Sequence, residues 1–155
     1  AKSGDSSDLK ERLMKIEDLA DEEPAKALPQ LLGHLNDQDP RIRAAAAEAL
    51  GEVGDPSAIE ALGRVLAKDE DSDVREAVAE ALGEMGSPNA VQVLRTGLRD
   101  ADSDVREAVV DALAEIGGPE AERVLRQALA DQDEDVRDAA AAALAKLKQQ
   151  QTKKK

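Results

Sequence analysis

The fold is decided by the segment Asp100-Ala-Asp-Ser-Asp-Val-Arg-Glu-Ala-Val-Val-Asp-Ala-Leu-Ala-Glu-Ile-Gly117. It is not unique, because near-copies of it begin at Asp37, Asp69 and Asp131. One arginine in each copy measures the period. Arg43, Arg75, Arg106 and Arg137 follow one another at steps of 32, 31 and 31, with Lys68 as the single insertion. A tandem array with this period predicts a solenoid of stacked helix pairs.

Each copy predicts one helix with a clear start and a clear end. Aspartate precedes the helix at Asp39, Asp71, Asp102 and Asp133, where its side chain can cap the first turn. Glycine follows it at Gly54, Gly86 and Gly117, where a left-handed residue is needed. We expect the glycines of this chain to be helix ends. Between these limits Val105, Val109, Ala112, Leu113 and Ile116 form one apolar stripe.

A second helix follows each of the first three glycines. Pro56, Pro88 and Pro119 restart the chain at a first helical position. Apolar residues at helical spacing come next, as in Ala90, Val91, Leu94 and Leu98. The N-terminal unit is less regular, with a helix expected from about residue 8 to 20 and Pro29 inside the next one. The last copy stops after its first helix.

The prediction is an all-α protein, an α-solenoid in which antiparallel helix pairs stack into a right-handed superhelix. The solenoid domain is expected over residues 8–148, with repeats at about 8–36, 37–68, 69–99 and 100–130 and a half-repeat at 131–148. Residues 1–7 and 149–155 are expected to be disordered.

The composition excludes several kinds of chemistry. The chain has no cysteine, no aromatic residue and one histidine, His34, on an apolar helix face. Zinc and non-haem iron sites need more imidazole or thiolate ligands than this, so no metal and no cofactor is predicted. Serine has no histidine partner in any visible nucleophilic arrangement, and no catalytic residue is assigned. The net charge of -13 argues against binding to nucleic acid or anionic membranes.

The Asp-x-Asp-x-Asp runs have some likeness to calcium-binding loops. Asp69, Asp71, Asp73 and Glu80 would take positions 1, 3, 5 and 12 of such a loop. Val74, however, stands at the sixth position, where the sharp turn needs glycine. We therefore interpret the acids as structural caps.

The pattern Asp-x-Asp-x-Asp-Val-Arg-x-Ala, continued by Ala-Leu, Gly and Pro-x-Ala, resembles the HEAT-like repeats of the phycobilisome lyase family. The resemblance implies a ladder of aspartate and arginine between successive repeats. Its members would be the pairs Asp37/Arg43, Asp69/Arg75, Asp100/Arg106 and Asp131/Arg137. Related chains include bilin lyase subunits, an iron-dependent hydroxylase, natural scaffold proteins and designed repeat proteins. The hydroxylase needs repeated His-Glu pairs, and this chain has none.

The charges divide between the two helices of each repeat. The first helices carry acidic stripes such as Glu76/Glu80/Glu84 and Glu107/Asp111/Glu115. The second helices, which line the concave face of such solenoids, carry the candidate partner-binding residues Arg64, Lys68, Gln92, Arg95, Arg99, Arg123 and Arg126. Alternatively, these arginines only pair with Glu60, Glu120 and Glu122.

The resulting functional hypothesis is a non-catalytic, cytoplasmic scaffold that binds a protein partner on the concave face. Two alternatives stay open: a bilin lyase or isomerase subunit, implied by the resemblance, and a designed scaffold without a natural partner. A monomer is expected, and self-association through the C-terminal half-repeat is the alternative.

Overall fold

The computed structural model describes residues 6–154, which fold into two layers of helices. The layer of first helices comprises α1 (Ser6–Ala20), α3 (Pro40–Val53), α5 (Ser72–Met85), α7 (Ser103–Ile116) and α9 (Glu134–Lys153). The layer of second helices comprises α2 (Pro24–His34), α4 (Ile59–Lys68), α6 (Val91–Gly97) and α8 (Gly118–Gln127). Three short 3₁₀ helices, η1 (Pro56–Ala58), η2 (Pro88–Ala90) and η3 (Ala128–Ala130), adjoin α4, α6 and α8.

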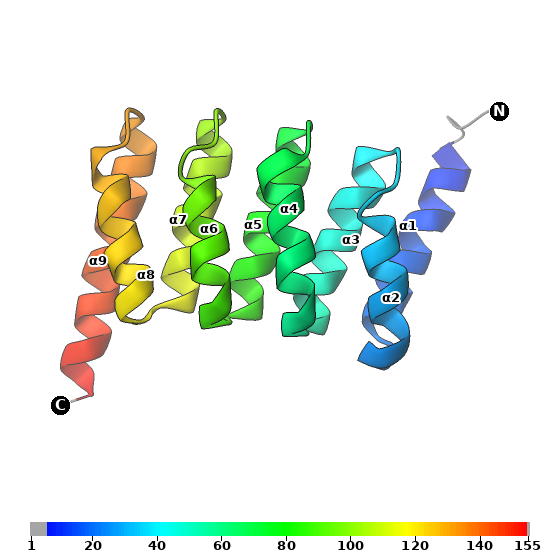
Figure 1. The fold of residues 1–155 in the computed structure, drawn as a ribbon, viewed down its shortest axis with the longest axis horizontal. Helices are drawn as coiled ribbons and strands as arrows, with labels where there is room; N and C mark the ends of the chain where they lie inside the picture. Colours follow the sequence, from blue (N-terminus) through cyan, green and yellow to red (C-terminus); the bar gives the residue numbers. More distant parts are fainter. Residues whose placement is uncertain (1–5, 155) are drawn as a thin grey trace.

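The helix pairs stack along one axis, with α1 and α9 at opposite ends (Figure 1). In this view the second helices lie in front of the first helices. No strand occurs in residues 6–154. The predicted all-α solenoid is therefore confirmed.

The helix limits follow the predicted caps. The side chains of Asp39, Asp71, Asp102 and Asp133 each accept a hydrogen bond from the main-chain N–H two residues further on. At the other end, Gly54 and Gly86 adopt left-handed φ angles of 72° and 66°. A residue with a side chain adopts a positive φ only at a cost in conformational free energy, so glycine is favoured at these positions. The starts and ends of the first helices are thus encoded locally.

The core lies between the two layers and consists of aliphatic residues. Leu50, Leu82 and Leu113 occupy the same position in successive first helices, and each is fully buried. Leu62, Leu94 and Leu125 face them from the second helices and are equally buried. Each side chain of this size contributes roughly 1.5–3 kcal/mol when it leaves water. A thin aliphatic core of this kind needs helices that approach one another closely.

Two glycines inside the first helices permit that approach. A Cβ atom on Gly51 would lie 2.9 Å from the Cα of Ala81, and one on Gly83 would lie 2.8 Å from the Cα of Ala112. The expectation that the glycines are helix ends is therefore wrong for these two residues, and also for Gly33 inside α2 and Gly63 inside α4. Gly51 and Gly83 sit where α3 crosses α5 and where α5 crosses α7, and the neighbouring backbone occupies the place of a side chain.

The C-terminal helix is longer than expected. The sequence predicted disorder from residue 149, whereas α9 continues to Lys153. Gln and Lys are good helix formers, and no glycine or proline interrupts the segment. The side chain of Gln151 also donates to Glu122 of α8 at 3.2 Å. At the other end α1 begins at Ser6, and residues 1–5, also expected to be disordered, lie outside the described part of the chain.

No helix in residues 6–154 is both long enough and apolar enough to span a membrane.

Candidate interaction site

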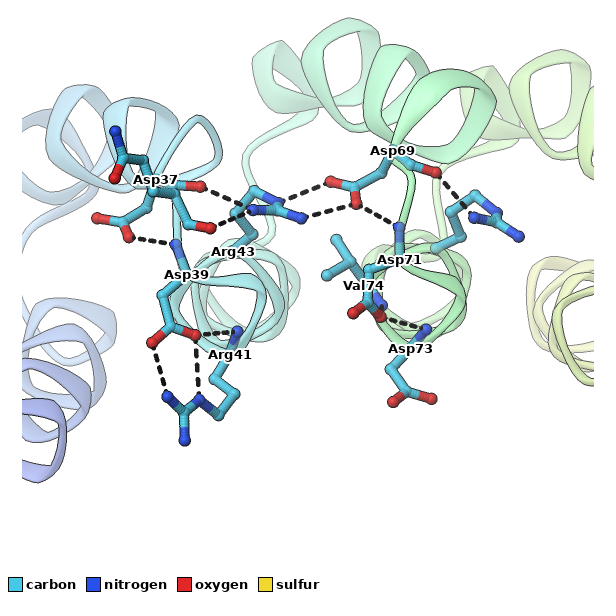
Figure 2. Close-up of polar contacts among 10 residues, drawn as sticks. Asp37, Asp39, Arg41, Arg43, Asp69, Asp71, Asp73 and Val74 are labelled. Atoms are coloured by element: carbon cyan, nitrogen blue, oxygen red, sulfur yellow. Dashed lines mark hydrogen bonds and ion pairs between the residues drawn. The ribbon is translucent and has the colours of Figure 1, made fainter. Parts of the chain in front are cut away.

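The scaffold of the site is a ladder of arginines in the turns between repeats. Arg43, in the first turn of α3, donates from Nε and Nη2 to the two carboxylate oxygens of Asp69 at 2.8 and 3.0 Å (Figure 2). Its Nη1 donates to the main-chain oxygens of Asp37 and Gln38 at 2.8 and 3.1 Å. One guanidinium therefore joins the turn of its own repeat to the turn of the next.

The same arrangement recurs along the stack. Arg75 binds both carboxylate oxygens of Asp100 at 2.8 and 3.1 Å, and Arg106 binds those of Asp131 at 3.0 and 3.2 Å. Charge-assisted bidentate pairs of this kind are among the stronger polar contacts in proteins. Within one repeat, the predicted pairs such as Asp37/Arg43 meet only through the main-chain oxygen of the aspartate. The carboxylate comes from the following repeat instead.

Both ends of the ladder differ from its middle. Arg12 of α1 forms an ion pair with Asp37, a contact that the sequence analysis missed. The signal was present, because Arg12 stands 31 residues before Arg43. At the other end Arg137 donates to the main-chain oxygen of Asp131 at 2.7 Å, and within residues 6–154 it has no carboxylate partner. The predicted ladder residues thus come together, although not as four equivalent pairs.

The acids of the turns are occupied by the fold itself. Asp69 accepts from Arg43 and from the main-chain N–H of Asp71, and Asp71 accepts from the N–H groups of Asp73 and Val74 (Figure 2). These contacts are those of caps and of the ladder, as the sequence analysis interpreted them. Among the described residues, no group of three potential metal ligands is found, and His34 is half-buried on α2.

The cationic residues of the second helices are exposed but differ in their partners. Arg64 donates to Glu60 at 3.1 Å and Arg126 to Glu122 at 3.0 Å, each four residues away on the same helix. By contrast, no ion pair within residues 6–154 involves Lys68, Arg95, Arg99 or Arg123. Gln92 donates to Glu120 of the next second helix. The predicted set therefore divides into paired and unpaired cations.

Recesses between neighbouring second helices lie next to these cations. One of about 530 Å³ lies between α2 and α4, with apolar residues such as Leu32 and Val65 and with Lys68 in its lining. Another of about 270 Å³ lies between α6 and α8, lined by Arg95, Arg99 and Gln127 among others. Between α4 and α6 the helices pack closely, since a Cβ atom on Gly63 would lie 2.6 Å from Val93.

The first helices present a surface of the opposite charge. A groove of about 640 Å³ between α5 and α7 is lined by seven carboxylates and Ala108. Burial and the neighbouring carboxylates raise the pKa of Glu76, Glu107 and Glu115, and burial raises the pKa of Asp111. These groups repel one another, so this surface costs stability at neutral pH.

Comparison with known proteins agrees with the repeat geometry. The sequence profile of HEAT repeats matches residues 4–82, 28–113 and 96–154. A chain in the structure of the complex of CpcE and CpcF of phycocyanin lyase from Nostoc sp. PCC7120 is 25% identical to this chain, with a TM-score of 0.71. The similarity covers 84% of this chain and 86% of that chain. An engineered protein is 26% identical with a TM-score of 0.62, covering 95% of this chain and 76% of that chain. No curated protein sequence matches. On these grounds the chain belongs to the HEAT repeat family.

Proposed function

We propose that this protein is a non-catalytic scaffold that binds a protein partner on the layer of second helices. The observation that carries the proposal is the set of unpaired cations, Lys68, Arg95, Arg99 and Arg123, on one layer of a chain whose net charge is -13. Exposed charges that no internal partner neutralises are available to a complementary surface. We place this layer on the concave side of the solenoid.

Two further observations support the proposal. The ladder ties successive repeats through bidentate contacts, so the second helices are held in fixed relative positions. One of the similar structures is itself a complex of two chains, CpcE and CpcF. Because aromatic anchors are absent, the interface would rest on arginine and on shape rather than on Trp or Tyr hot spots.

The proposal is tested by affinity capture from a lysate of the organism that encodes the protein, followed by charge reversal. Arg95→Glu combined with Arg123→Glu, on the second helices, should abolish capture of the partner. The matched control is Glu80→Lys combined with Glu107→Lys on the first helices, which should leave capture intact. If the partner is still captured after the arginine changes and is lost after the glutamate changes, the interface lies on the first helices and the proposal is refuted.

A second candidate is a bilin lyase or isomerase subunit, favoured by the similarity to the phycocyanin lyase complex. This candidate rests on that similarity, since no residue of the chain is assigned a catalytic role. Incubation with phycocyanobilin and an apo-phycobiliprotein distinguishes the two. A coloured covalent adduct would favour the lyase, and its absence would leave the scaffold.

The similarity to an engineered protein favours a third candidate, a designed scaffold with no natural partner. In that case affinity capture would retain the same proteins as a column of unrelated acidic protein. A partner that the charge-reversed variant fails to retain would exclude this candidate.

A further inference from the structure

We propose that the recess between α6 and α8 binds a carboxylate-rich peptide segment, with Arg95, Arg99 and Arg123 as the anchors. This inference rests on the proposed scaffold function and names the chemistry of its partner. It also restricts the binding residues, because it excludes the paired arginines Arg64 and Arg126 from the anchor set.

The recess is lined by two cations, Arg95 and Arg99, and by Gln127 of the next second helix. Its volume is about 270 Å³, and its lining consists of Gln92, Arg95, Thr96, Leu98, Arg99 and Gln127. Arg95 lies in the last turn of α6, and Arg99 follows it by four residues. Arg123 precedes Gln127 by four residues on α8 and therefore lies on the same side of that helix.

The two carboxylates of α8 are already engaged by other residues. Glu120 accepts from Gln92 of α6. Glu122 accepts from Arg126 at 3.0 Å and from Gln151 of α9 at 3.2 Å. Within the described residues, no carboxylate forms an ion pair with Arg95, Arg99 or Arg123. The guanidinium groups of Arg95 and Arg99 at the recess, and that of Arg123 on the adjoining helix α8, thus keep their hydrogen-bonding capacity for a ligand.

Helix dipoles account for only part of this cluster. A cation in the last turn of a helix gains about 0.3–1 kcal/mol from the helix dipole, and Arg95 and Arg126 occupy such positions. Arg99 lies beyond the end of α6, and Arg123 lies before the last turn of α8. Their positions have no such explanation, whereas binding a shared anion uses both.

The backbone under the recess is fixed. The N–H of Arg99 donates to the main-chain oxygen of Thr96 at 3.2 Å, and the Thr96 hydroxyl donates to Val93 at 2.7 Å. Leu98 is half-buried and packs against the core. The backbone from which the side chains of Arg95 and Arg99 project is therefore ordered, which lowers the entropic cost of binding.

A peptide fits this site better than a nucleic acid does. Arginine binds carboxylates through two parallel N–H···O bonds, and a short acidic segment senses mainly the charges within about 8 Å at physiological salt. A polyphosphate chain would extend beyond the recess into the field of a chain with net charge -13. The chain also has no aromatic residue on which bases could stack.

The test measures fluorescence anisotropy of a fluorescein-labelled peptide of alternating Glu and Ser, titrated with the intact protein. The expected result is saturable binding that weakens with added salt. Arg95→Gln combined with Arg99→Gln should raise the Kd at least tenfold. Arg64→Gln combined with Arg126→Gln makes the same charge change on the same layer, at arginines paired with Glu60 and Glu122. This control should change the Kd less than twofold.

Each other outcome overturns the inference. Equal weakening in both double variants would show a diffuse electrostatic effect instead of a site. Tighter binding of a single-stranded oligonucleotide than of the peptide would assign the recess to nucleic acid. Absence of peptide binding would refute the peptide site alone, because the scaffold function is judged by capture of its partner. The midpoint of thermal unfolding, followed by circular dichroism, should be unchanged in both double variants. Arg95→Lys combined with Arg99→Lys should bind the peptide with intermediate affinity, because the charge is kept and the bidentate geometry is lost.

Discussion

The ladder residues Arg43, Arg75, Arg106 and Arg137 lie in the first turn of their helices, where the helix dipole opposes a positive charge. The cost is offset by acceptors from two repeats. For Arg106 these are the carboxylate of Asp131 and the main-chain oxygens of Asp100 and Ala101. Burial tends to raise the pKa of Asp131, but hydrogen bonds from Arg106 and Asp133 outweigh it, and the pKa is lowered. The pair is therefore ionised in the native protein at neutral pH.

Arg106 and Arg137 provide a matched pair of residues for testing the ladder. Arg106→Ala should lower the free energy of unfolding by about 2–4 kcal/mol, because Asp131 keeps its buried charge and loses its bidentate partner. Arg137→Ala makes the same truncation at an arginine that binds no carboxylate of residues 6–154, and it should lower the free energy of unfolding by about 1 kcal/mol. Urea unfolding followed by circular dichroism measures both. Equal losses would show that the carboxylate contributes nothing beyond the main-chain contacts.

At the level of the elements, the sequence predicted what is encoded locally. Aspartate caps, apolar stripes and the left-handed glycines Gly54 and Gly86 need only the residues of one helix, and they were confirmed. Gly117 ends α7 with a positive φ but with ψ of -169°, outside the predicted left-handed helical conformation, because α8 begins at the next residue. The carboxylate partners of the ladder and the role of Gly83 depend on how one repeat meets the next. Their residues could be named, but their contacts required the turn geometry and the distance between helices. The pairing of Arg64 with Glu60 and of Arg126 with Glu122 follows from their spacing of four residues, whereas the engagement of Glu120 by Gln92 depends on rotamers that spacing does not determine.

Gly83 and Gly33 test the close packing of the first helices. Gly83→Ala should lower the free energy of unfolding by about 1–3 kcal/mol, because the new Cβ would lie 2.8 Å from the Cα of Ala112 and would push α7 away. Helix propensity alone predicts a gain of up to about 1 kcal/mol for the same change. Gly33→Ala places a Cβ where nothing lies within 4 Å, and should stabilise by roughly 0.5–1 kcal/mol. Thermal unfolding measures both variants, and a stabilised Gly83→Ala protein would contradict the packing argument.

At the level of the whole molecule, acidic groups crowd the first helices, whereas the second helices carry only Glu60, Glu120 and Glu122. Burial and mutual repulsion raise the pKa of Glu76, Glu107 and Glu115 above the usual 4.5. A carboxyl whose pKa is raised in the folded state binds protons more tightly there than in the unfolded chain. Its contribution to stability is present below pH 4.5 and is lost as the pH rises through the raised pKa.

Other carboxyls act in the opposite direction. A hydrogen bond from Arg41 lowers the pKa of Asp39, and hydrogen bonds from Ser57 lower that of Asp55, below the usual 3.8. Their contributions, with that of Asp131, are present above pH 3.8 and are lost as the pH falls through the lowered values. The free energy of unfolding should therefore rise as the pH is lowered from 7, reach its maximum near pH 4, and fall in stronger acid. Urea unfolding at a series of pH values measures this profile.

The acidic groove between α5 and α7 can be identified as the source of that profile by removing two of its charges. Glu107→Gln combined with Asp111→Asn should raise the melting temperature at pH 7, because it removes two partly desolvated carboxylates that face like charges. At pH 3, below the usual pKa of 4.5 for Glu107 and of 3.8 for Asp111, the same variant should melt close to the unchanged protein, since both groups have raised pKa values and are then largely protonated in it. Salt at about 1 M, which shortens the screening length to about 3 Å, should reduce the difference at pH 7. A variant that is stabilised equally at both pH values would show that packing, and not charge, explains the effect.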